Sequence, residues 1–331
     1  LINNQYIGTL KGLKLELDLK IGALDTDIKS LKKAARQNVG PEILNRIKKI
    51  TDTGLIELKD DFKIYWEKFP IAKLCPGNDY LEPEINLIID DMIESSDQKK
   101  LSSFLEKWIS DKISNELKNL IDLKYLKQEN PHIRALAYHL YENNGVVKRV
   151  EVLEFLKKIT QEDRKILRNL GVRFGRYHIF LFKLFKPSIV SLRVLLWKNF
   201  HQKYLNLNPP KFGLNFVEIK DLQDRNFMLL CGFEKFEKYF VRIDILERLF
   251  VKLFNIQSKD KEIKLVPEML NLLGCNKDNF LKIIKLMDYK SFEKDNETFI
   301  KYMPRKMKRI NKFNNIKSDN PFGVLNKLSF K

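Results

Sequence analysis

The segment Asn169–His178, which reads NLGVRFGRYH, carries the most specific local combination of residue types in the chain. Its two glycines allow another group to approach the backbone closely. Two arginines alternate with two aromatic residues, and this combination suits single-stranded nucleic acid, because arginines contact phosphates and aromatic rings stack on unpaired bases. The candidate nucleic-acid-binding residues here and in the turn that follows are Arg173, Phe174, Arg176, Tyr177, Lys183 and Lys186.

The same segment also fits a buried strand. In that alternative the aromatic rings belong to the core, and the arginines pair with nearby carboxylates. The segment alone leaves both interpretations open.

A second basic segment, Lys301–Lys317, has seven cationic residues and no acidic one. Its cations are Lys301, Arg305, Lys306, Lys308, Arg309, Lys312 and Lys317, and the first six join the candidate nucleic-acid-binding site. Tyr302 and Phe313 are interleaved with them. Such a tail can follow a phosphate backbone. The alternative is a solubilising tail that binds nothing.

No part of the sequence carries a recognisable catalytic signature. A motor ATPase needs a glycine-rich phosphate loop with the pattern GxxxxGK[ST], which is absent. The run Ile88–Asp91 resembles a magnesium-holding strand, but its neighbours continue a helical pattern, so we interpret it as the acidic end of a helix. The histidines are His132, His139, His178 and His201.

None of these histidines has a Cys or acidic partner at metal-ligand spacing. We therefore assign no catalytic residue, no metal and no cofactor to this chain. A cleft that gathers His132 and His139 with the pair Asp90–Asp91 would revive an enzymatic interpretation.

The composition favours a globular protein with a polyanionic partner. The 331 residues carry a formal net charge of +18, and 44% of them are apolar. Such a chain is long enough for two or three domains, and its charge attracts RNA or DNA, although lysine is spread over the whole sequence. Three widely spaced cysteines favour a reducing cytoplasm over a disulfide framework. No apolar stretch is long enough to span a bilayer, so we expect no membrane partner.

Hydrophobic periodicity predicts a mainly helical chain with small antiparallel β elements, an α+β fold. Residues 1–82 are predicted to be a mixed segment with a small β-meander, and residues 83–204 a helical domain with one strand in the GVRFG motif. The strands expected before residue 83 are Leu13–Leu19, Leu55–Leu58, Phe62–Trp66 and Phe69–Leu74. The expected helices are Asp27–Gln37, Pro41–Ile50, Glu84–Ile93, Gln98–Ile121, Pro131–Asn143, Lys148–Ile159, Gln161–Leu170 and Pro187–Phe200.

Three further segments complete the predicted organisation. Residues 205–240, which contain Pro209–Pro210, are predicted to be a linker and irregular segment. Residues 241–303 show three helices and then two strands, the order of a winged helix, whose third helix Lys277–Met287 would face a ligand. Residues 304–331 form the basic tail.

Several short motifs follow one another in the order known from one helicase family. The longest is LRNLGVRFGRYH at 167–178, followed by LFKP at 184–187 and LRVLLW at 192–197. Others are IYW at 64–66, IAKL at 71–74, RALAY at 134–138, VRIDILERL at 241–249, LGC at 273–275 and NPFGVL at 320–325. With these motifs the chain resembles the C-terminal region of alphaproteobacterial superfamily 2 DExH helicases, which are related to the RNA helicase of the mitochondrial degradosome. It departs from them at Phe182, where Pro is usual, and at Gly323, where Ala is usual.

The resemblance implies a region without a motor, which lies behind the two RecA-like domains of an ATP-driven RNA helicase. ATP and magnesium would belong to those domains, which are expected before Leu1. We therefore expect a non-catalytic region that binds single-stranded RNA or DNA and guides it behind the motor domains of the same polypeptide. The alternative is a protein-interaction scaffold that docks a ribonuclease or ribosomal partner through its winged-helix-like end.

Overall fold

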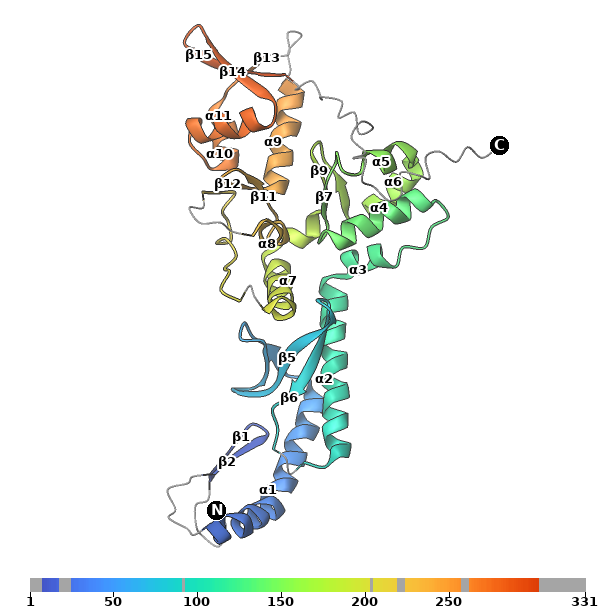
Figure 1. Cartoon of the computed structure of the whole chain (residues 1–331), viewed down its shortest axis with the longest axis vertical. Helices are drawn as coiled ribbons and strands as arrows, with labels where there is room; N and C mark the ends of the chain where they lie inside the picture. The colour runs from blue at the N-terminus through green and yellow to red at the C-terminus, as the bar shows by residue number, and fades with distance from the viewer. Residues whose placement is uncertain are drawn as a thin grey trace, which may run out of the picture. The chain divides into compact units, whose positions relative to one another are not determined.

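The structure, a computed structural model, describes residues 8–17, 25–90, 93–202, 205–218, 224–256 and 262–303 (Figure 1). These residues form a mixed α+β fold with several small antiparallel sheets, as predicted. The chain divides into two compact units, which are residues 1–252 with 272–274 and residues 253–271 with 275–331. No helix in the described ranges is both long and apolar enough to cross a lipid bilayer.

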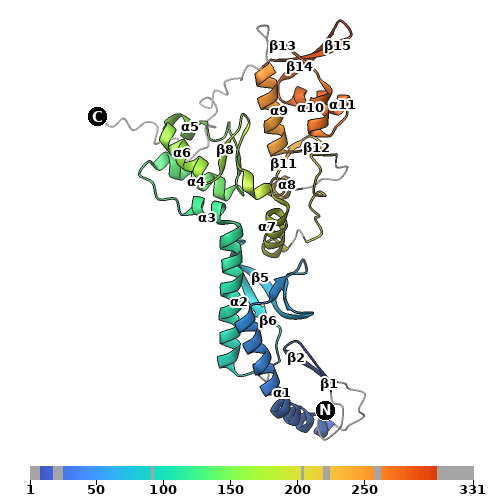
Figure 2. The ribbon, with the colours of Figure 1, turned by 180° about the vertical axis from the view of Figure 1, so that it is seen from behind.

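Unit 1 begins with a hairpin, a long helix, a four-stranded sheet and a second long helix. These elements are β1 (Gly8–Lys11), β2 (Lys14–Leu17), α1 (Asp25–Thr53), β3 (Ile56–Leu58), β4 (Lys63–Trp66), β5 (Phe69–Asp79), β6 (Glu82–Leu87) and α2 (Ser95–Glu116). The sheet has the order β3-β4-β5-β6. Figures 1 and 2 show α2 running beside α1 and the edge strand β6 from both sides. Ile50, Ile71 and Leu105 from these elements share one core.

The predicted meander is confirmed, but it has one strand more than expected. Residues 84–93, predicted as a helix, begin as strand β6, because Pro83, Ile85 and Leu87 alternate with exposed polar residues at a period of two. The expected strand at 13–19 is β2 as far as Leu17, where this described range ends.

The two helices predicted before residue 51 are one helix in the structure. α1 continues through Pro41, although proline removes one helical hydrogen bond. Ile43, Ile47 and Ile50 lie at helical spacing after this proline and are buried in the core. Their burial explains why the helix continues, because tertiary packing outweighs the local preference.

The middle of unit 1 is helical around a three-stranded sheet with the order β7-β9-β8. Its elements are α3 (Lys118–Lys124), α4 (Pro131–Glu142), β7 (Val146–Lys148), α5 (Leu153–Lys158), α6 (Gln161–Asn169), β8 (Val172–Phe174), β9 (His178–Leu181), the 3-10 helix η1 (Phe182–Phe185) and α7 (Pro187–Phe200). The helix predicted at 98–121 is interrupted at Leu117, and the one predicted at 148–159 begins only at Leu153. The single strand predicted here, with an alternating pattern from Gly171 to Leu181, is two strands, β8 and β9, and the third strand β7 was not expected.

Unit 1 ends in a second small sheet, which has the order β10-β12-β11. Its elements are β10 (Phe216–Glu218), α8 (Arg225–Leu230), β11 (Phe233–Phe236), β12 (Tyr239–Arg242) and α9 (Ile243–Ile256), whose residues from Leu253 onward belong to unit 2. The prediction of a linker over 205–240 is therefore wrong in its second half. Phe227, Phe233 and Phe240 are buried in a core that this segment shares with α7.

Unit 2 contains two helices and a three-stranded antiparallel sheet with the order β13-β15-β14. Its elements after α9 are β13 (Glu262–Lys264), α10 (Pro267–Leu273), α11 (Lys277–Leu286), β14 (Tyr289–Lys294) and β15 (Glu297–Tyr302). The helices and the hairpin match the predicted ranges closely, and β13 is an addition. Asp295 and Asn296 form the hairpin turn with positive φ, as a two-residue turn of this type requires.

Candidate nucleic-acid interface

Two glycines shape the hairpin β8–β9, which contains the motif singled out in the sequence. Gly171 follows α6 in the left-handed conformation, with φ of +91°, and ends that helix. At Gly175 a Cβ atom would lie 2.5 Å from Cδ of Glu247 and 2.7 Å from the carbonyl oxygen of His178. Only glycine fits this second position without a shift of its neighbours, so the expected close approach to the backbone is confirmed here.

The Glu247 carboxylate is the group that approaches Gly175. Its Oε2 atom accepts a hydrogen bond from the backbone N–H of Arg176 at 2.5 Å. Its Oε1 atom accepts from the N–H groups of Tyr177 at 3.0 Å and His178 at 2.7 Å. Three backbone donors on one carboxylate fix the turn of the hairpin to helix α9, and charge-assisted hydrogen bonds of this kind are the stronger ones.

The imidazole of His178 lies between two buried carboxylates. Its Nδ1 atom is 3.2 Å from Oε1 of Glu247, and its Nε2 atom is 3.0 Å from Oε2 of Glu234. Because both ring nitrogens face carboxylate oxygens, this geometry favours the imidazolium form, in which both nitrogens donate. Burial by itself lowers the pKa of His178, but the hydrogen bonds and charges of the two glutamates raise it above its ordinary value.

Glu234 on β11 gathers positive charge from three elements. Lys148 Nζ lies 3.5 Å and Arg225 Nη2 lies 3.3 Å from its Oε1 atom, in addition to His178 at Oε2. Burial raises the pKa of this carboxyl, but the hydrogen bond from His178 and the three positive charges lower it to about 2. These residues border a small polar cavity of about 70 Å³, which has room for about two water molecules. Buried charge is thus neutralised by partners on β7, α8 and β9.

The structure places the predicted cations of the hairpin segment on its surface. Arg173, Arg176, Lys183 and Lys186 are all exposed. Arg173, Lys183 and Lys186 have no ion-pair partner among the described residues. The alternative in which the arginines pair with carboxylates therefore does not apply to Arg173.

The two aromatic residues of the motif have structural partners. Phe174 packs partly against the main core, and the guanidinium carbon of Arg168 lies 5.6 Å from the centroid of its ring. The ring centroid of Tyr177 is 4.2 Å from that of buried Phe250 on α9. The more exposed ring is Phe182, over which Arg173 lies at 5.8 Å. Phe174 and Tyr177 thus orient the hairpin, and Phe182 is the better candidate for contact with a base.

The second predicted basic segment is described only at its start. Lys301 lies on β15, half-buried, with its Nζ atom 3.3 Å from Oε1 of Glu262. The other candidates of this segment, Arg305, Lys306, Lys308, Arg309 and Lys312, lie outside the described residues.

Sequence reasoning missed Glu247 and Glu234, and it assigned no role to His178. One signal was present for Glu247. Ile243, Leu246 and Phe250 are apolar at helical spacing around it, so a carboxylate stands on the buried face of a predicted helix. A charge in such a position needs a partner. Glu234 lies in the segment predicted as irregular and offered no comparable signal.

The described residues hold no group of three or more His, Cys, Asp or Glu side chains arranged for a metal ion. His132 and His139, considered for an enzymatic site, both lie against the ring of Phe155, at centroid distances of 6.4 and 5.2 Å. Comparison with known proteins found no matching family model, curated protein or solved structure.

Proposed function

We propose that this chain is a non-catalytic nucleic-acid-binding region that belongs to an ATP-dependent RNA helicase and guides a single strand behind the motor domains. The observation that carries the proposal is the hairpin segment 171–186. It holds Arg173, Lys183 and Lys186, which are exposed and have no acidic partner among the described residues, on a backbone that Glu247 fixes from α9. A fixed set of unpaired cations can contact successive phosphates without first breaking ion pairs of its own.

The helicase part of the proposal rests on the ordered motifs of the sequence. The structure adds a physical reason for two of them, because the Gly175 turn of the first motif receives Glu247 of the motif VRIDILERL. These two motifs therefore form one structural unit, in which the conformation of the Gly175 turn depends on Glu247.

A winged helix is our proposal for the fold of residues 243–302. The order of α9, β13, α10, α11 and the hairpin β14–β15, with β15 central in the sheet, supports this assignment. In such a fold α11 is the helix that enters a groove or meets a partner. Lys277, Lys282 and Lys285 are exposed on α11, whereas Phe280 and Ile284 are buried. A scaffold that docks a ribonuclease or ribosomal protein through this helix needs an exposed apolar face, so the exposed lysines favour nucleic acid.

Binding of a fluorescein-labelled single-stranded RNA, followed by polarisation over a series of salt concentrations, tests the proposal. Arg173→Ala, Lys183→Ala and Lys186→Ala are combined in one variant. Each phosphate contact contributes about 0.7 to the slope of log affinity against log salt for a single strand, so losing three contacts lowers the slope by about 2.

A matched control variant combines Lys48→Ala, Lys49→Ala and Lys68→Ala. These lysines are exposed on α1 and in the turn between β4 and β5, and the net charge changes by the same amount. The control variant keeps the slope of the unaltered chain if the hairpin is the binding surface. RNA binding that is absent or independent of salt, or an equal loss in both variants, contradicts the proposal.

A further inference from the structure

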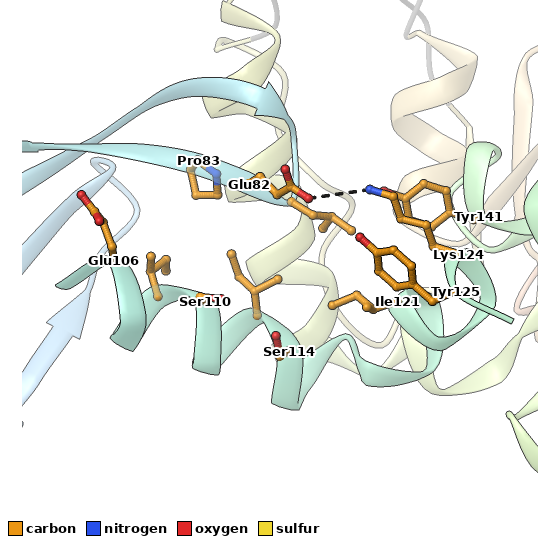
Figure 3. Close-up of a pocket in the computed structure, with 12 residues that line it drawn as sticks. Glu82, Pro83, Glu106, Ser110, Ser114, Ile121, Lys124, Tyr125 and Tyr141 are labelled. Atoms are coloured by element: carbon orange, nitrogen blue, oxygen red, sulfur yellow. Dashed lines mark ion pairs between the residues drawn. The ribbon is translucent and has the colours of Figure 1, made fainter. Parts of the chain in front are cut away.

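A groove lies between helix α2 and the edge strand β6, away from the hairpin residues described above. Its volume is about 340 Å³, which is in the lower part of the range of ligand sites in proteins. Figure 3 shows the groove between the strand and the helix, with Tyr125 at one end and Glu106 at the other. The residues that matter most below are Glu82, Glu106, Ile109, Ile113, Lys124 and Tyr125.

The floor of the groove is aliphatic. Ile109 and Ile113 from α2 and Leu81 before β6 are buried there, and Ile121 from α3 is partly exposed. At the end of α3, Tyr125 lines the groove and leaves 62% of its surface exposed. A large apolar side chain placed here would cover Tyr125 and the aliphatic floor together.

The rim of the groove is acidic on balance, in contrast to the strongly basic chain. Glu82 and Glu106 are both exposed, and Glu106 accepts a hydrogen bond from Ser102 one turn earlier in α2. The single cation, Lys124, already lies 3.4 Å from Oδ2 of Asp79 and 3.7 Å from Oε1 of Glu82. The carboxylates of Glu82 and Glu106 thus outnumber the one ammonium group among the lining residues, and that ammonium group is shared between Glu82 and Asp79.

Asp79 and Tyr141 hold Lys124 in this neutralised position. The hydroxyl of Tyr141 donates to Oδ2 of Asp79 at 2.7 Å, and the ammonium of Lys124 lies over the Tyr141 ring at 5.1 Å. The backbone N–H of Leu81 donates to the other oxygen of Asp79. The Lys124 ammonium is therefore not available to attract an anionic ligand into the groove.

We propose that this groove docks a basic, apolar segment of a protein partner, with a large apolar side chain on the isoleucine floor and a flanking Lys or Arg at Glu82 or Glu106. The charge of the rim is complementary to such a segment. The same charge repels the phosphates of a nucleic acid strand, so the groove is distinct from the proposed RNA-binding hairpin. The proposal is independent of that function, and either can fail without the other.

Three tripeptides with blocked ends are added to the full chain. They test separately the charge contact and the apolar contact of the proposed ligand. They are Lys-Phe-Lys, the charge-reversed Glu-Phe-Glu, and Lys-Ala-Lys, which lacks the apolar ring. Each is titrated while the methyl resonances of Ile109, Ile113 and Ile121 are followed, with buried Ile283, which does not line the groove, as the reference. We expect saturable shifts at the three groove isoleucines with Lys-Phe-Lys only.

Two pairs of variants locate the binding. Glu82→Lys with Glu106→Lys should weaken Lys-Phe-Lys binding about 3- to 10-fold, as expected for two exposed charge contacts. Glu84→Lys on the exposed face of β6 serves as the charge control outside the groove. Ser114→Trp should fill the groove and abolish the shifts, whereas Ser103→Trp, exposed on the same helix, should leave them intact.

Several results would overturn the proposal. Shifts of equal size with Glu-Phe-Glu would remove the charge argument, and equal shifts with Lys-Ala-Lys would remove the apolar one. The absence of shifts with Lys-Phe-Lys would remove the site. Shifts with adenosine 5′-monophosphate but not with Lys-Phe-Lys would assign the groove to a nucleotide instead.

Discussion

The sheets β7-β9-β8 and β13-β15-β14 each have three short antiparallel strands, but charged groups occupy different places in them. In the first sheet, His178 and its partners Glu234 and Glu247 are buried, with 3 to 7% of each side chain exposed. In the second, the ion pairs Lys264–Glu297 and Lys301–Glu262 remain 29 to 50% exposed. Aromatic pairs such as Phe292 with Phe299 supply its cross-strand packing.

This difference matters for what each sheet can do. Each buried charge needs its hydrogen-bond partners in place, because an unpaired buried charge is costly. Only one position of the β8–β9 turn therefore allows Glu247 and His178 to form their hydrogen bonds together. Exposed ion pairs form and break at little cost and do not define a unique geometry. The exposed cations of the first sheet therefore stand on a preorganised backbone, which lowers the cost of ordering them on a ligand.

The largest expected effect comes from removing the carboxylate that holds the turn. Glu247→Ala leaves three backbone N–H groups and Nδ1 of His178 without their acceptor. We expect the free energy of unfolding to fall by about 3–5 kcal/mol, as is typical when one partner of a buried charged group is removed. Urea denaturation followed by tryptophan fluorescence measures this in unit 1, which holds Trp66, Trp108 and Trp197.

Glu162→Ala is the control, because Glu162 is exposed in the first turn of α6 in the same unit and its removal should change stability by no more than about 0.5 kcal/mol. A change below about 1 kcal/mol for Glu247→Ala would mean that the buried cluster does not hold the first sheet.

Gly175→Ala should have the next largest effect. The added Cβ meets Cδ of Glu247 at 2.5 Å and the carbonyl oxygen of His178 at 2.7 Å, and neither can withdraw without losing a hydrogen bond. We expect a loss of about 1–3 kcal/mol by the same urea assay. Gly40→Ala in α1 meets nothing within 4 Å and should be neutral or stabilising. If the clash with Glu247 is the cause, Gly175→Ala should cost less in a Glu247→Ala background, and full additivity would argue against it.

The charge on His178 makes the stability of the first sheet depend on pH. Its pKa in the folded chain is raised above the ordinary 6.5, so its contribution is complete below about pH 6.5 and is lost as the pH rises through the folded value. The pKa of Glu234 is lowered from 4.5 to about 2, so its contribution is complete above pH 4.5 and is lost as the pH falls toward 2. The free energy of unfolding of the unaltered chain minus that of His178→Gln should therefore decline above pH 6.5, by at most about 1.4 kcal/mol per pH unit. If the free energy of unfolding of the unaltered chain exceeds that of His178→Gln by the same amount from pH 6 to 9, the two glutamates do not stabilise a charged His178.

Local pattern was enough to predict the elements whose neighbours along the chain are also their neighbours in space. The meander β3–β4–β5 and helix α4 are of this kind. β7 pairs with β9, so Val146 lies opposite Phe180, and β10 pairs with β12. Three-residue strands give almost no periodic signal, and such distant pairing is decided by the core. For this reason both sheets were missed.

In the candidate site, too, local sequence predicted some features, whereas others depend on distant parts of the chain. The GVRFGRYH motif and the need for its glycines could be read from the sequence, because close approach demands a residue without a side chain. The carboxylates around the motif could not be identified from the sequence, since Glu247 lies far along the chain and Glu234 stands in a segment predicted to be irregular. The exposure of Arg173 and the burial of the Tyr177 ring against Phe250 depend on which face of β8–β9 meets α9, and a two-sided alternating pattern does not specify that face.

The smallest expected effect concerns the partly exposed ion pairs of the sheet β13-β15-β14. Lys301 on β15 stands between Glu262 of β13, at 3.3 Å, and Lys290, its direct neighbour on β14. Lys301→Ala removes one exposed ion pair and one like-charge contact, so the opposing terms leave a loss of less than about 1 kcal/mol. Amide hydrogen exchange at Ile300, which is buried in this sheet, reports the change.

Lys290→Ala keeps the ion pair and removes only the repulsion, so it should be neutral or slightly stabilising. Because the pair with Glu262 is partly exposed, 0.5 M salt should narrow the difference between the two variants. A loss of several kcal/mol for Lys301→Ala that persists at high salt would mean that both sheets rely on buried charge, and the contrast between them would disappear.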